Sequence, residues 1–198
     1  MPGVKSLGGI FMKTNKTITL KKIPRTKMVV TVGIFSAIAF ILQLIGSFIG
    51  LKVGGFLEIE FSDIPALIVA LAYGPLSGIL VEFVKNILHC AVTSTGFVGE
   101  FANFIINGIL CLVAGIIYNN KKTYKGAIIA LLAATVMMSL AGILVNRYIM
   151  LPLYMPDAPR EVIYGLVMGT ILPFNIAKGF VISLITFFLY KRISKIIK

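Results

Sequence analysis

Apolar residues in this chain fall into long segments, separated by short segments rich in Gly, Pro and charged residues. Several of these segments approach the ~20 residues that a helix needs to cross a bilayer. The pattern predicts six helices, at 28–50, about 63–73, about 76–92, about 99–118, 126–151 and about 161–190. We therefore expect an all-α membrane protein with six transmembrane helices.

Helix-ending residues support these boundaries. Pro65 suits the first turn of the second helix, which has a short apolar core, and Gly74-Pro75 ends it. Pro173 lies inside the sixth helix, where it removes one backbone hydrogen bond and should bend the helix.

Composition agrees with a membrane protein. Hydrophobic residues make up 58% of the 198 residues and charged residues 13%, whereas a soluble domain is about half apolar and about a quarter charged. The formal net charge of +12 would suggest nucleic acid as a partner of a soluble protein. The basic residues are clustered without an aromatic-basic groove pattern, so we expect a lipid bilayer as partner and no nucleic acid.

The basic clusters predict the topology. They hold seven residues before the first helix (Lys5, Lys13, Lys16, Lys21, Lys22, Arg25, Lys27), three between the fourth and fifth (Lys121, Lys122, Lys125) and four after the sixth (Lys191, Arg192, Lys195, Lys198). All three lie on the cytoplasmic side, as the positive-inside rule requires, only if the short second helix crosses. We therefore expect six crossings, cytoplasmic termini, and loops 51–62, 93–98 and 152–160 outside.

One membrane domain accounts for most of the chain. We expect a basic cytoplasmic segment at 1–27, a six-helix membrane domain at 28–192 and a basic cytoplasmic tail at 193–198. The first 27 residues do not resemble a cleaved secretory signal, because a full-length apolar span without a small-residue cleavage site follows them.

Polar residues within apolar helices are functional candidates by default. Asn175 and Lys178 are three residues apart, so they lie on one face of the sixth helix, and Asn146 is near the outer end of the fifth. Glu82 and Lys85 on the third helix can neutralise each other, which favours a structural ion pair. His89 is the only histidine, and no spacing supports a metal site.

The chain lacks the motifs of common catalytic sites, including G-x-S-x-G, H-E-x-x-H and the ATP-binding P-loop. We therefore expect no enzyme activity and no ATP hydrolysis by this chain. A partner-independent secondary transporter that uses Glu82 or Lys85 as a proton-linked group stays an alternative. A membrane enzyme would need paired acids facing a cavity, and most of the acids fall in predicted outer loops or in the first two residues of the helices that follow them.

A series of motifs resembles one family. FLEIEFSDIPALIVALAYGPLSGILVEFVKNILH, GFVGEFANFI, NRYIMLPLY and LPFNIAKG occur in this order within 26–192. Together they resemble the riboflavin-specific substrate-binding subunits (S components) of energy-coupling factor (ECF) transporters. The resemblance implies a multi-pass protein of a prokaryotic cell membrane that captures riboflavin from outside the cell. FMN is a further candidate ligand. It also implies a transmembrane coupling subunit (T component) and two cytoplasmic ATPases as partners, and no cofactor. An S component for another vitamin is a further alternative.

The resemblance also implies site residues. Asn146, Asn175 and Lys178 match the residues that hold the isoalloxazine ring, and Glu58, Ser94 and Gly99 match neighbouring contacts. Gly33 and Ala37, in small-xxx-small spacing, match the face that contacts the coupling subunit. An Asn amide can donate and accept toward the pyrimidine edge of a flavin, whereas Lys only donates. Aromatic candidates for the walls around the ring are Phe56, Phe97, Phe101 and Tyr148.

Overall fold

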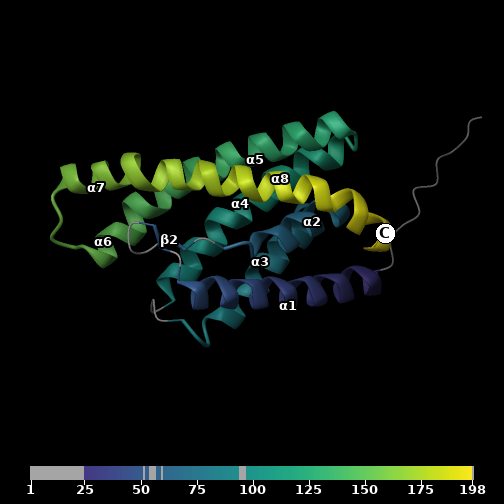
Figure 1. Ribbon diagram of the computed structural model, residues 1–198, viewed down its shortest axis with the longest axis horizontal. Helices are drawn as coiled ribbons and strands as arrows, with labels where there is room; N and C mark the ends of the chain where they lie inside the picture. The colour runs from purple at the N-terminus through teal and green to yellow at the C-terminus, as the bar shows by residue number, and fades with distance from the viewer. Residues whose placement is uncertain (1–24, 51, 54–56, 59, 94–96, 198) are drawn as a thin grey trace, which may run out of the picture.

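A computed structural model of the chain describes residues 25–50, 52–53, 57–58, 60–93 and 97–197 (Figure 1). The first half contains α1 (Arg25–Ile49), β1 (Lys52–Val53), β2 (Leu57–Glu58), α2 (Asp63–Tyr73), α3 (Pro75–His89) and α4 (Val98–Asn120). The second half contains α5 (Tyr124–Val145), the π-helix η1 (Asn146–Met150), α6 (Leu151–Tyr154), α7 (Arg160–Leu166), the π-helix η2 (Val167–Ile171) and α8 (Leu172–Ile197). Because α5 to α6 and α7 to α8 are each continuous, the six expected helices are all present.

The first outer loop differs from the sequence prediction, which gave it no strands. β1 and β2 form an antiparallel pair, with Lys52 opposite Glu58 and Val53 opposite Leu57. Strands of two residues are too short to produce an alternating pattern in a sequence, so periodicity could not detect this hairpin.

Each π-helix ends two residues before a proline. A proline ring inside a helix clashes with the carbonyl four residues earlier, which is Tyr148 for Pro152 and Gly169 for Pro173. Both of these residues lie inside a π-helix, where the wider backbone turn relieves the clash. The sixth helix therefore contains a π-helix before Pro173, where the sequence predicts a bend, and the second π-helix, before Pro152, was not predicted.

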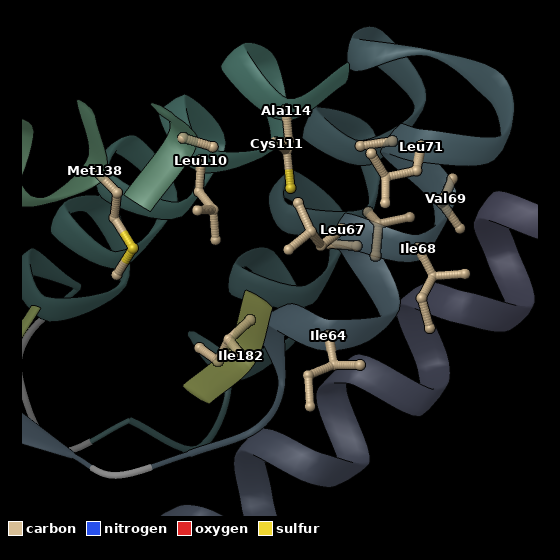
Figure 2. Close-up of a cluster of buried hydrophobic side chains, with 14 of the residues drawn as sticks. Ile64, Leu67, Ile68, Val69, Leu71, Leu110, Cys111, Ala114, Met138 and Ile182 are labelled. Atoms are coloured by element: carbon tan, nitrogen blue, oxygen red, sulfur yellow. The ribbon is translucent and has the colours of Figure 1, made fainter. Parts of the chain in front are cut away.

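Helix α2 lies at the centre of the bundle, in contact with α1, α3, α4 and α8. All its residues from Asp63 to Ala72 are buried, as expected for a helix that is apolar on every side. Figure 2 shows Leu67 of α2 beside Cys111 of α4, whereas Ile68 points toward α1. This apolar core fixes the position of the start of α2, where the charged residues of the site gather.

Within the described residues, four helical segments are long and apolar enough to cross a membrane, namely Arg25–Ile49, Val98–Asn120, Tyr124–Tyr154 and Arg160–Ile193. Helix α2 is apolar but has only 11 residues. At 1.5 Å per residue it spans about 16 Å, roughly half of the hydrocarbon core. The six-crossing topology, which depends on α2, therefore stays a prediction.

The three basic segments of the described chain lie at one end of the molecule. Figure 1 shows the start of α1, the connection between α4 and α5, and the end of α8 together at this end. The Lys191 ammonium of α8 lies 5.5 Å from the ring centre of Tyr124, the first residue of α5. This arrangement is consistent with the common cytoplasmic side that the sequence predicts.

Candidate functional site

Buried charged side chains gather where the start of α2 meets α3 and α8. The members of this group, which we call the ion cluster, are Glu60, Asp63, Glu82, Lys85 and Lys178. Their side chains are between 0 and 10% exposed. Buried charges are strongly unfavourable unless they are paired, so these contacts fix both α3 and α8 against the start of α2.

The ammonium group of Lys85 is fully paired with side chains of the protein. Its Nζ lies 2.7 Å from Asp63 Oδ1 and 2.7 Å from Glu82 Oε2, which confirms the predicted pair with Glu82. It also donates to Ser62 Oγ at 3.1 Å. These partners use all three donors of the ammonium group. Neither Lys85 nor Glu82 lines the cavity described next.

Lys178 borders a cavity of about 650 Å³ between η2, α8 and the segment before α2. The lining residues are Glu60, Phe61, Gly169, Thr170, Pro173, Phe174, Ala177, Lys178, Val181 and Ile182. Lys178 Nζ lies 3.0 Å from Asp63 Oδ2 and 3.4 Å from Glu60 Oε1. Two of its three donors are thus directed to carboxylates, which leaves one for a ligand. A mostly apolar cavity with few fixed polar groups is the usual form of a small-molecule site.

Asn103 of α4 also binds the carboxylate of Glu60. Its Nδ2 donates to Glu60 Oε1 at 2.8 Å, and Asn107 Nδ2 donates to Asn103 Oδ1 at 3.0 Å. Glu60 itself is 4% exposed. The carboxylate at the cavity wall is therefore fixed by groups from two helices, α4 and α8.

The structure brings Asn146 and Asn175 together at Gly142 of α5. Asn146 Nδ2 donates to the Gly142 carbonyl at 2.8 Å, and a Cβ at Gly142 would lie 2.6 Å from Asn175 Nδ2. Both amides are buried, but neither lines the cavity. Of the three residues predicted to hold the isoalloxazine ring, Asn146 and Asn175 therefore lie together against α5, and Lys178 lines the cavity.

Glu58 of β2 belongs to a second polar group, with Ser47 of α1 and His89 of α3. Ser47 Oγ donates to Glu58 Oε2 at 2.9 Å and lies 3.4 Å from His89 Nε2. His89 Nδ1 is 2.9 Å from Glu100 Oε1 at the start of α4. These contacts join the first loop to three helices, which gives His89 a structural partner.

The remaining predicted site residues lie elsewhere. Gly99 is half-buried in the first turn of α4. Phe97, Phe101 and Tyr148 are more than half exposed and do not line the cavity, whose described aromatic side chains are Phe61 and Phe174. Phe56 and Ser94 lie outside the described residues.

Sequence reasoning missed Glu60 and Asp63 as site residues and assigned them to an outer loop and a helix start. A signal was present, because three of the chain's seven acids fall within 58–63, directly before an apolar helix. A lysine in the middle of the sixth helix required a buried acid as partner. The sequence did not indicate which acid it was.

Comparison with known proteins identifies the family. A sequence model of the substrate-specific component of ECF transporters matches residues 27–190. The riboflavin transporter RibU of Staphylococcus aureus (strain TCH60) is 36% identical over 179 residues, which cover 88% of this chain and 94% of that protein. The riboflavin transporter FmnP of Bacillus subtilis (strain 168) is 35% identical over 170 residues, covering 81% of this chain and 88% of that protein.

The fold agrees with the family. A solved structure of the S component of a bacterial ECF transporter matches with a TM-score of 0.75 and 36% sequence identity, and it covers 88% of this chain and 99% of that one. The predicted S-component fold is thereby confirmed, and the family consists of transporter subunits rather than enzymes. This chain belongs to the substrate-specific components of ECF transporters.

Proposed function

We propose that this chain is the riboflavin-binding S component of an ECF transporter in a bacterial cell membrane. The main evidence is that two relatives named riboflavin transporters are 36% and 35% identical to it, over 88% and 81% of this chain. The chain captures the vitamin from the outer side of the membrane. Transport then requires the T component and two ATPases, because this sequence contains no ATP-binding motif of its own.

The site chemistry suits a flavin. The third donor of Lys178 can bind a ring carbonyl, and the amides of Asn146 and Asn175 can donate and accept toward the pyrimidine edge. Phe61 and Phe174 supply apolar surface for the ring. Glu58, Ser94 and Gly99 remain proposed neighbouring contacts, and Phe56, Phe97, Phe101 and Tyr148 remain proposed ring contacts.

The T component contacts the face of α1 that carries Gly33 and Ala37. Both residues are exposed, and a Cβ at Gly33 would meet no atom within 4 Å. Packing within the chain therefore does not explain the small side chains at these positions. Large apolar residues surround them on the same helix, including Val30 at 55% and Ile34 at 55% exposed, as expected for a surface that contacts lipid or another membrane helix.

Riboflavin binding by the isolated protein tests the proposal. The chain is purified in detergent without partners, and its visible absorption spectrum is recorded before and after denaturation. We expect a flavin band that is released on unfolding, and quenching of added riboflavin fluorescence on titration. A colourless protein that also leaves riboflavin fluorescence unchanged would contradict the function and favour another vitamin.

A further inference from the structure

Glu60 has a polar atom that the described protein does not satisfy. Its Oε1 accepts from Asn103 and Lys178, while its Oε2 is buried and has no hydrogen-bond partner among the described residues. The side chain is 3% exposed and borders the cavity. A buried carboxylate oxygen without a donor is costly, so this position calls for a donor from a bound molecule.

The orientation of Glu60 is fixed independently of any ligand. Asn103 and Lys178 are both donors toward Oε1, and they come from α4 and α8 on different sides of the carboxylate. The second oxygen is therefore an acceptor held in a defined place before a ligand arrives. Acceptors of this kind give specificity, because a ligand that lacks the matching donor leaves a buried charge unpaired.

A flavin offers two kinds of donor. One is the imide N–H of the pyrimidine ring, and the others are the hydroxyl groups of the ribityl chain. Lys178, beside Glu60, can only donate, so it serves the flavin carbonyls and cannot bind either of these donors. The cavity therefore needs an acceptor as well, and Glu60 is the acidic residue among its described lining.

We propose that Glu60 is a specificity-determining residue, whose carboxylate accepts a hydrogen bond from an N–H or O–H donor of the bound flavin. This inference rests on the proposed riboflavin-binding function. It gives the site an acceptor that complements the donor of Lys178. Asp63 and Glu82 each have a buried carboxylate oxygen without a hydrogen-bond partner among the described residues as well, that of Asp63 lying in an ion pair. Neither residue lines the cavity, whereas Glu60 does.

Glu60→Gln in the full chain tests the acceptor. The amide oxygen of the new side chain faces Asn103 and Lys178, because both are donors, and the amide NH₂ then replaces the acceptor. We expect riboflavin affinity, measured by fluorescence quenching, to fall by at least about tenfold. Glu161→Gln makes the same change at an exposed residue of α7 that lies outside the ion cluster and does not line the cavity, and it should bind riboflavin within about twofold of the wild type. Unchanged riboflavin affinity in Glu60→Gln would overturn the proposal.

Two flavin analogues identify the donor. N3-methylriboflavin lacks the imide N–H, and lumiflavin lacks the ribityl hydroxyls. The wild type should bind at least one of them about tenfold more weakly than riboflavin, and the loss caused by Glu60→Gln should disappear for that analogue. A loss of equal size for all three flavins would mean that Glu60 acts only by positioning Lys178, and it would overturn the proposal.

The wild-type measurements do not depend on the folding of any variant. Wild-type affinity that is equal for riboflavin and both analogues contradicts the proposal while leaving the proposed function intact. A wild type that binds none of the three flavins contradicts the proposed function, and the assignment of Glu60 as a flavin acceptor fails with it.

Discussion

Asn175, a residue that the sequence singled out, owes its position to the absence of a side chain opposite it. Its amide donates to the Ile171 carbonyl at 2.9 Å and lies against the backbone of Gly142. A Cβ at Gly142 would come within 2.6 Å of Asn175 Nδ2, closer than packed atoms allow. The glycine on α5 therefore determines where the amide on α8 can lie.

Gly142→Ala should weaken riboflavin binding. The new methyl group displaces the Asn175 amide, so we expect affinity to fall by at least about tenfold and the melting temperature to decrease, as overpacking does. The measurements are fluorescence quenching and thermal unfolding in detergent.

Gly108→Ala is the matched control, because Gly108 is a buried helical glycine whose new Cβ would meet only Phe104 Cε2 at 4.0 Å. It should bind normally and be as stable or more stable. Normal binding by Gly142→Ala would exclude Asn175 from the site.

Among the helices, α1 has a distinct role. It packs on α2 and α3 through one face, while Gly33, Ala37 and large apolar side chains occupy its exposed face. Helices in lipid associate through small residues that let backbones approach closely. This division leaves one face of α1 for the bundle and one for a partner helix.

Gly33→Leu should impair assembly with the T component without affecting the flavin site. The larger side chain separates the two helices, so we expect riboflavin uptake and co-purification with the T component and ATPases to decrease by at least about fivefold, or about 1 kcal/mol. Riboflavin affinity of the isolated chain should not change. Gly165→Leu on α7 is the matched control, since Gly165 is also helical and exposed, with no atom within 4 Å of a new Cβ. Equal uptake by both variants would contradict the proposed interface.

For the whole molecule, the short and buried α2 decides the topology. Both ends of the chain lie on the same side of the membrane only if α2 and α3 together make an even number of crossings, which is two in the predicted topology. Figure 1 shows the start of α1 and the end of α8 at one end of the bundle, with the connection between α6 and α7 at the opposite end. The positions of the basic clusters agree with this arrangement.

Cysteine labelling in intact cells tests whether α2 and α3 together make an even or an odd number of crossings. Cys90 and Cys111 are both free, so they are first replaced, and single cysteines are introduced at the exposed residues Arg25, Lys122, Asp157 and Lys191. A membrane-impermeant maleimide should label Asp157→Cys directly and the other three only after permeabilisation. Labelling of Arg25→Cys without permeabilisation, with Lys122→Cys and Lys191→Cys still protected, would mean that α2 and α3 together make one crossing.

The sequence by itself determined the features that depend on neighbours along the chain. Apolar length gave the helices, Gly74-Pro75 separated α2 from α3, and the three-residue spacing of Glu82 and Lys85 produced an ion pair. Local hydrogen bonding and helical periodicity control these features, so a one-dimensional pattern contains them. The family resemblance added Asn146, Asn175 and Lys178 as candidates.

Only the tertiary structure decided which distant residues meet. Glu60 and Lys178 are 118 positions apart, and their contact depends on α8 packing beside the start of α2. Several acids could have paired with Lys178 on charge alone, and the bundle selects Asp63 and Glu60 because the buried apolar faces of α2 and α8 must fit together. The same packing placed Gly142 against Asn175 and left one oxygen of Glu60 without a partner among the described residues. Side-chain packing in three dimensions sets these contacts, and no spacing along the chain records them.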